Sequence, residues 1–288
     1  MKTFFAALLF CSAFLGGASL AQDGGNVDFK STELSTGLYM IEGVGGFAGG
    51  NMALSVGEDG VILIDDSLPP LSQKLMAAIA KVTDKPVDFV VNTHVHGDHT
   101  GGNEAFGKAG ATIVAHDNIR KRMLADKPKD ALPVITFAHG LTFHLNGQEA
   151  RVIHLKDAHT DGDAIIHFPG LDLIHTGDLC FNGMFPFIDL NSGGTVDGYI
   201  AAQEKIIALS GPNTRIIPGH GPLGNKADME KNLAVLKDSK QKIAALVAQG
   251  KSEDEVLAAN PLAEHESYSW VFITTERIIR TIYKDLNN

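Results

Sequence analysis

Seven side chains of the types that bind transition metals are spaced along this chain. The densest group lies between Thr93 and Asn103, where T-H-V-H-G-D-H-T-G-G-N places three histidines and one aspartate within six residues. Two histidines one residue apart in extended backbone point to the same side, and imidazole and carboxylate are ligands that zinc accepts. The full set of candidate metal ligands is His94, His96, Asp98, His99, His159, Asp178 and His220.

Each part of this set follows a short apolar segment and has small residues beside it. His94 comes directly after the apolar residues 89–91, and Gly97 allows a tight turn that lets Asp98 and His99 face a second position. His220 lies in P-G-H-G-P after another apolar segment. Strand ends that deliver side chains to one edge are typical of a metal site built on loops over a rigid scaffold.

The alternative for the first cluster is an exposed histidine-rich loop without a metal. That alternative does not explain why the later ligand candidates also follow apolar segments. The remaining histidines are expected in ordinary surface or hydrogen-bonded roles, with His175 a candidate supporting residue because it lies three positions before Asp178. These remaining histidines are His116, His139, His144, His154, His167, His175 and His265.

The elements that must position these residues alternate between short strands and helices. Apolar runs predict strands at 38–42, 51–56, 61–64, 89–91, 112–115, 151–154, 164–168, 171–174 and 215–217. Helical spacing predicts helices at 71–82, 196–209, 226–249 and 268–286, after a polar lead-in at the start of the mature chain. A segment with five glycines in eight residues, 43–50, predicts a mobile connection, and Phe47 in it either faces a substrate or packs within the loop.

Composition limits the class of protein. The chain has 288 residues, 44% of them hydrophobic, which excludes a disordered protein. Its 24 basic and 34 acidic residues argue against binding of nucleic acid or anionic lipid by general electrostatic attraction. No linker or low-complexity tract divides the sequence, which favours one β/α-layered domain over residues 22–288 with helices at its C-terminal end.

The first residues have the pattern of a secretory signal peptide. Lys2 is followed by an apolar run that is too short to span a bilayer, and Ser19 and Ala21 suit cleavage after Ala21. We therefore expect residues 1–21 to be removed and the protein to be periplasmic or secreted, without a stable membrane anchor. Removal of Cys11 leaves Cys180 alone, so the mature chain has no internal disulfide, and Cys180 is expected to be a small core residue.

The spaced set of ligands resembles that of the metallo-β-lactamase superfamily, over about residues 36–225. The resemblance implies an α/β fold of the αββα sandwich type, with two mixed sheets flanked by helices. It implies a first metal held by His94, His96 and His159, a second held by Asp98, His99 and His220, and Asp178 as the bridge. Asp65 matches an aspartate that the family places behind the metals.

This resemblance implies a hydrolase with two zinc ions, since five of the seven ligands are imidazoles; iron or manganese also suits nitrogen and oxygen donors. Zinc lowers the pKa of bound water to about 7, so hydroxide is available to attack a carbonyl at neutral pH. Asp98 is the expected catalytic residue, because it can bind a metal and also orient this hydroxide. The expected partner is a small-molecule substrate, with no nucleic acid and no obligate protein partner.

The sequence leaves the substrate open. Export and the glycine-rich segment favour a periplasmic β-lactamase, which would contribute to antibiotic resistance. However, family β-lactamases with a second-metal cysteine carry it where this chain has Asp178, and their drug-binding lysine corresponds to Phe181. Asp178 instead matches glyoxalase-II-like enzymes, so a secreted lactonase or thioesterase is the alternative. A second alternative is a metal-binding or assembly factor without enzymatic activity, which would use its C-terminal helices, within residues 226–288, for docking.

Overall fold

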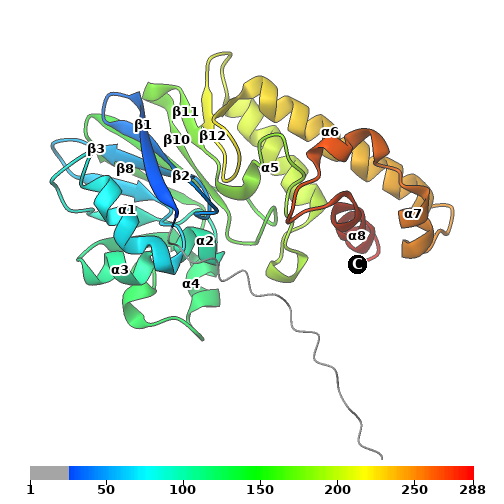
Figure 1. Cartoon of the computed structure of the whole chain (residues 1–288), viewed down its shortest axis with the longest axis horizontal. Helices are drawn as coiled ribbons and strands as arrows, with labels where there is room; N and C mark the ends of the chain where they lie inside the picture. Colours follow the sequence, from blue (N-terminus) through cyan, green and yellow to red (C-terminus); the bar gives the residue numbers. More distant parts are fainter. Residues whose placement is uncertain (1–25) are drawn as a thin grey trace, which may run out of the picture.

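Two β-sheets lie face to face in the computed structural model, which describes residues 26–288 (Figure 1). Each sheet contains both parallel and antiparallel pairs, and helices cover the outer faces. The expected α/β architecture of two mixed sheets flanked by helices is therefore confirmed. The predicted signal peptide, residues 1–21, lies outside the described residues.

The first sheet has seven strands in the order of the chain. Its central strand β4 is buried on both faces, because Leu63 packs with Leu75 of helix α1 while Ile62 and Ile64 face the second sheet. The strands are β1 (Asp28–Ser35), β2 (Leu38–Val44), β3 (Met52–Val56), β4 (Val61–Ile64), β5 (Phe89–Val91), β6 (Thr112–His116) and β7 (Ile135–Phe137). The helices beside this sheet are α1 (Ser72–Ile79), α2 (Gly97–Thr100), α3 (Asn103–Lys108) and α4 (Asp117–Met123).

The second sheet has six strands in the order β13-β12-β11-β10-β9-β8. Its outer face packs against the C-terminal helices, where Ile174 and Ile216 share one core with Tyr199 and Ile278. The strands are β8 (Gly140–Leu145), β9 (Gln148–His154), β10 (Ala164–Phe168), β11 (Leu173–His175), β12 (Arg215–Ile217) and β13 (Gly224–Asn225). The helices are α5 (Val196–Leu209), α6 (Lys226–Val247), α7 (Glu253–Ala259) and α8 (Thr275–Leu286).

The sequence predictions differ from the structure at both ends of the described residues, and they also omit the strands β7, β8 and β13 and the helices α2, α3, α4 and α7. The polar lead-in contains strand β1, an edge strand that buries Phe29 and leaves most of its other side chains in contact with solvent. The helix predicted from residue 268 begins only at Thr275, because the Thr274 hydroxyl accepts a hydrogen bond from the amide of Arg277 and caps the helix there. Residues 269–274 therefore form a non-helical segment before α8.

The strand ends determine where the candidate ligands meet. The parallel strands β4 and β5 end just before Asp65 and His94, and the parallel strands β11 and β12 end just before Asp178 and His220. Parallel strands present their carboxyl ends at one edge of a sheet, and the two sheets bring these edges together. Among residues 26–288, no helix combines the length and apolar character that crossing a membrane requires.

Helix α5 supports the backbone around Asp178. The fully buried Tyr199 donates a hydrogen bond from its hydroxyl to the carbonyl of Asp178 at 2.9 Å. Gln203, one turn later, donates to the carbonyl of Leu179 at 3.2 Å. The turn that carries Asp178 is therefore attached to a helix as well as to strand β11.

We predict that Tyr199→Phe lowers the free energy of unfolding by about 1 kcal/mol, because a buried carbonyl loses its partner. Urea denaturation measures the change. Tyr283→Phe is the matched control, since the Tyr283 hydroxyl bonds to the Lys251 carbonyl at the exposed surface, at 3.3 Å. An equal loss in both variants, or none in either, would contradict the role assigned to Tyr199.

Candidate metal centre

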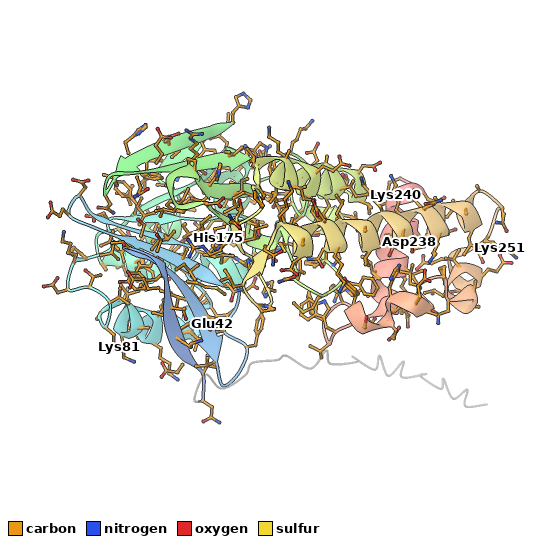
Figure 2. All side chains as sticks on the ribbon, turned by 90° about the horizontal axis from the view of Figure 1, so that it is seen from above. Glu42, Lys81, His175, Asp238, Lys240 and Lys251 are labelled. Atoms are coloured by element: carbon orange, nitrogen blue, oxygen red, sulfur yellow. The ribbon has the colours of Figure 1, made fainter. Side chains whose placement is uncertain are left out.

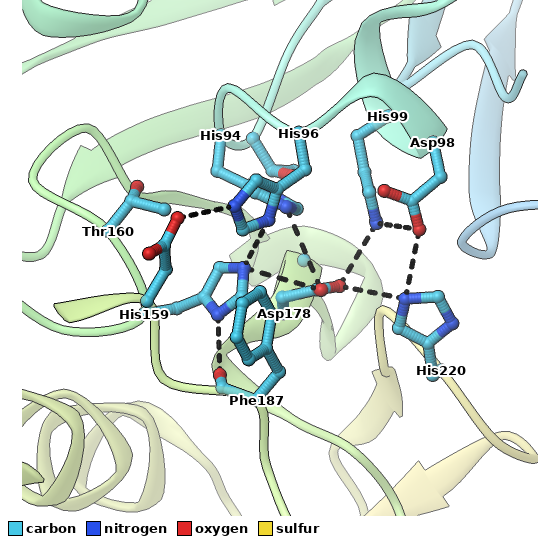
Figure 3. A network of polar contacts seen from close by, with 12 residues as sticks. His94, His96, Asp98, His99, His159, Thr160, Asp178, Phe187 and His220 are labelled. Carbon is cyan, nitrogen blue, oxygen red and sulfur yellow. Dashed lines mark hydrogen bonds and ion pairs between the residues drawn. The ribbon is translucent and has the colours of Figure 1, made fainter. Parts of the chain in front are cut away.

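The structure brings all seven predicted ligands together at one edge of the sandwich (Figure 3). They form two adjacent groups, and within each group one donor atom per residue lies within 4.8 Å of the others. The first group is His94, His96, His159 and Asp178, and the second is Asp98, His99 and His220. Apart from Asp178, which the resemblance implied as the bridge, the members of each group are those that the resemblance implied for one metal.

Asp178 lies between the two groups, and each of its carboxylate oxygens faces one of them. Oδ2 is 3.7 Å from His94 Nε2 and 3.4 Å from His159 Nε2. Oδ1 is 3.1 Å from His99 Nε2 and 3.4 Å from His220 Nε2. A single carboxylate is thus placed to be shared by both groups.

Asp98 belongs to the second group alone. Its Oδ2 is 3.6 Å from His99 Nε2 and 3.4 Å from His220 Nε2. The Asp98 side chain is 21% exposed, whereas that of Asp178 is 4% exposed. Of these two carboxylates, Asp98 is therefore the one that solvent can reach.

Hydrogen bonds behind two of the histidines determine which ring nitrogen carries the proton. His159 Nδ1 lies 2.6 Å from the carbonyl of Phe187, which can only accept, so Nδ1 donates and Nε2 keeps a lone pair. The Thr93 hydroxyl donates its proton to Asp65, so at 3.1 Å it accepts from His94 Nδ1. Both Nε2 lone pairs are thereby directed into the centre.

Carboxylates orient two further histidines in the same way. His99 Nδ1 donates to Asp65 Oδ2 at 2.7 Å, so its Nε2 faces Asp178. In His96 the roles of the two ring nitrogens are exchanged. Its Nε2 donates to Asp189 Oδ2 at 3.1 Å, and its Nδ1 lies 2.9 Å from His159 Nε2. Asp189 was not found from the sequence. Its Oδ1 accepts a hydrogen bond from the amide of Asn191, and an aspartate with this bond is typical of an ordinary turn.

Buried nitrogen and oxygen atoms that have no hydrogen-bond partner support the presence of a cation. Among residues 26–288, His94 Nε2, His99 Nε2 and Asp178 Oδ1 are buried and make no hydrogen bond. The last two atoms are 3.1 Å apart but are not aligned for one. Each buried polar atom without a partner costs about 1–3 kcal/mol. Since all three atoms face the centre, these residues fit a bound metal with nitrogen and oxygen ligands.

The electrostatics of the two groups differ. Burial lowers the pKa of His159 to about 4, which keeps this imidazole neutral and able to bind a metal. Burial also acts on His220, but the carboxylates of Asp178 and Asp98 outweigh it and raise the pKa of His220 to about 9. These carboxylates therefore favour a positive charge at His220, whether it comes from a proton on the ring or from a metal ion beside it.

The residues expected to lie outside the centre do so. His175 is buried, and it bonds to the carbonyl of Asn51 and the amide of Gly177 without joining either group. Cys180 is a core residue whose sulfur accepts from Asn232, and burial raises the pKa of its thiol to about 12. A third group of residues with metal-ligand side chains is Asp238, Glu264 and His265. It lies at the helical end of the molecule, where Figure 2 labels Asp238. Asp238 pairs there with Lys242 and His265.

Comparison with known proteins is consistent with this geometry. Residues 45–220 match the Metallo-beta-lactamase superfamily. The chain is 28% identical over 198 residues to a hydroxyacylglutathione hydrolase of Nitrosococcus oceani, covering 65% of this chain and 68% of that protein. It is 24% identical over 208 residues to metallo-beta-lactamase IND-1 of Chryseobacterium indologenes, covering 70% and 86%.

A solved structure shows that the fold is shared. The metallo-beta-lactamase from Pontibacter korlensis superimposes with a TM-score of 0.63 at 21% identity, covering 73% of this chain and all of that one. At this identity the likeness concerns the fold and does not extend to the substrate.

We predict that the purified protein binds about two equivalents of transition metal, because the donors form two groups. His94→Ala and His220→Ala, one from each group, should each reduce this to about one equivalent. Elemental analysis after dialysis measures the content, with the exposed His144 replaced by alanine as the matched control. Unchanged content in both ligand variants would contradict the assignment.

Asp65→Asn should weaken metal binding by about 10–100-fold while the protein remains folded, because the partner of both Thr93 and His99 loses its charge. Asp65 has φ 58°, a left-handed conformation that asparagine adopts readily. Competition with a chromophoric chelator measures the affinity.

Asp172→Asn is the control for this prediction. Asp172 has φ 50° and precedes β11, at the opposite end of that strand from Asp178. Equal affinities of the two variants would show that Asp65 does not support the centre.

Proposed function

The chain belongs to the metallo-β-lactamase superfamily, and we propose that it is a dinuclear metallohydrolase that opens a cyclic acyl substrate, a β-lactam in the first instance. The observation that carries the proposal is Asp178, whose two oxygens each face one donor group. A carboxylate placed in this way would hold one cation for each donor group, and two such cations would supply chemistry that suits the hydrolysis of a carbonyl compound. From the signal-peptide pattern, we propose that it acts after export.

The residues of the centre have distinct roles in this proposal. His94, His96 and His159 would hold one ion, Asp98, His99 and His220 the other, and Asp178 both. Bound zinc would supply Lewis-acid polarisation of the carbonyl and a lowered pKa for water. Asp98 would accept a hydrogen bond from the attacking water and orient it, because its carboxylate is the more exposed of the two.

Two observations favour a second candidate, a lactonase or thioesterase. Phe181, where the resembling β-lactamases carry a lysine, is buried and stacked on His220 with ring centroids 5.0 Å apart. Phe181 therefore provides no positive charge that could pair with the carboxylate of a β-lactam. In addition, the relative named hydroxyacylglutathione hydrolase is a thioesterase by its name. The same pair of donor groups suits both candidate functions, so assays with different substrates must distinguish them.

The experiment is a panel of nitrocefin, an N-acyl homoserine lactone and S-lactoylglutathione, run side by side on metal-loaded protein. We expect turnover of at least one substrate, loss of activity on chelation, and a drop of at least about 100-fold in kcat/KM for His96→Ala. His144→Ala, a surface histidine variant, should keep full activity.

The substrate that is turned over decides among the candidates. Hydrolysis of nitrocefin alone would support the β-lactamase, and hydrolysis of the lactone or thioester alone would support the second candidate. Two equivalents of bound metal with no turnover on the whole panel would contradict the hydrolase and favour a metal-binding or assembly factor.

A further inference from the structure

We propose that five aromatic side chains form a substrate-binding wall that selects cyclic acyl compounds bearing an apolar, planar side group. This aromatic wall consists of Phe47, Phe181, Phe187, Trp270 and Phe272. The inference deepens the proposed hydrolase and rests on it for the position of the scissile bond.

One end of the aromatic wall contacts the second donor group. Phe181 stacks on His220 with ring centroids 5.0 Å apart and an interplanar angle of 20°. Phe47, from the glycine-rich segment, lies parallel to the same imidazole within 12°, at 6.1 Å. Phe181 is buried, whereas Phe47 is exposed, so the wall begins in the core and reaches the surface beside His220.

The other end contacts the first donor group. Phe187 stacks on His96 with ring centroids 5.5 Å apart and an interplanar angle of 24°. The same ring meets His159 edge-on at 5.6 Å, and the Phe187 carbonyl accepts from His159 Nδ1. Phe187 therefore positions His159 through its backbone carbonyl and contacts His96 through its ring.

Two rings from the segment 269–274 close the gap between these ends. Trp270 lies 5.9 Å from Phe181 and 5.7 Å from Phe272, and Phe272 meets Phe187 edge-on at 5.5 Å. The rings thus form a continuous arc from His220 to His96. An apolar group on a substrate at the centre would lie against this arc.

The aromatic wall lies beside the accessible part of the centre. His96 is 21% exposed and His220 11%, whereas His94, His99 and His159 are almost fully buried. A substrate therefore approaches the face that His96 and His220 present to solvent. These are the two ligands on which Phe187 and Phe181 stack.

Specific contacts hold the rings of Trp270 and Phe272 in place. The Trp270 indole donates to the carbonyl of Phe185 at 2.9 Å. The Arg277 guanidinium lies over Phe272, 4.3 Å from its centroid, and donates to the Phe272 carbonyl at 2.9 Å. Phe272 is nevertheless 46% exposed. An aromatic side chain that is held rigidly and left open to solvent is typical of a binding surface.

The chemistry of the aromatic wall favours an apolar, planar group. Aromatic rings attract one another in offset or edge-to-face contacts, which a phenyl group on the substrate can continue. The guanidinium of Arg277 is engaged with the rings of Phe272 and Phe187. Residues 269–274 lie beyond the part of the chain that matches the superfamily, so family membership does not by itself imply this selectivity.

The test compares substrates that share a nucleus and differ in one phenyl group. Benzylpenicillin is compared with 6-acetamidopenicillanic acid, and N-phenylacetyl with N-acetyl homoserine lactone, by kcat/KM. We expect the phenyl substrate to be preferred in the unmodified protein. Phe272→Ala should reduce that preference about ten-fold, because the variant loses a whole ring contact.

Three further variants separate ring chemistry from damage to the fold. Val271→Ala is the control, since this neighbouring side chain is 93% exposed and belongs to no part of the wall. Phe272→Tyr keeps the ring and should retain the preference. Phe272→Leu keeps apolar packing but loses the planar face, so it should lower the preference even where Phe272→Ala unfolds.

A binding measurement separates failure of this inference from failure of the proposed hydrolase. The chain has one tryptophan, Trp270, whose fluorescence reports on ligands at the wall. Phenylacetate should change that fluorescence at concentrations where acetate does not, and Phe272→Ala should weaken the effect about ten-fold.

If no substrate is turned over but this binding pattern is seen, the aromatic wall is supported and the hydrolase is not. If hydrolysis is efficient but neither kcat/KM nor fluorescence distinguishes the phenyl compounds, the wall is overturned and the hydrolase stands.

Discussion

A carboxylate buried among four imidazoles is the constraint on which this structure depends. Removing Asp178 from water is unfavourable unless positive charge compensates it, and the surrounding histidines lower its pKa against the effect of burial. Among the described residues, Asp178 Oδ1 and the facing nitrogens His94 Nε2 and His99 Nε2 are nevertheless buried without hydrogen bonds. The fold therefore creates a place where a cation is more favourable than water or a protein neighbour.

Holding that arrangement requires support from several layers of the protein. Tyr199 of α5 binds the backbone of Asp178, while Asp65 at the end of β4 binds both Thr93 and His99. Asp65 does this from a left-handed backbone conformation that costs free energy in an aspartate. The neighbouring strands and the hydrogen bonds of Asp65 keep the residue in this conformation. In this conformation its carboxylate reaches both Thr93 and His99.

The same scaffold links the centre to the C-terminal helices. Phe185, next to Phe187 in the loop after Asp178, packs in the core shared with α5, α6 and α8, and its backbone binds the segment that carries Trp270. Through this loop, the non-helical segment 269–274 places the ring of Trp270 near His220 and the ring of Phe272 against Phe187, which stacks on His96. The positions of the metal ligands and the aromatic contacts thus both depend on the same hydrophobic core.

The sequence by itself identified the seven candidate ligands and, through a family resemblance, the type of fold. Histidines and aspartates after apolar strands are local patterns, because a strand of period two and a glycine turn are set by nearby residues. For the same reason, the strand Val61–Ile64 and the helix Val196–Leu209 were predicted at their observed bounds. Edge strand β1 was missed, since its apolar signal is confined to a few residues on one face.

Tertiary structure alone decided which distant groups meet. Asp189 contacts His96 across 93 positions of sequence, and no local pattern distinguishes it from a turn aspartate. The sequence likewise left open whether Phe47 faces a substrate, and it assigned Trp270 to a helix. Their places beside His220 depend on the packing of loops from both sheets and of the C-terminal helices, and long-range packing of this kind leaves no periodic trace in the chain.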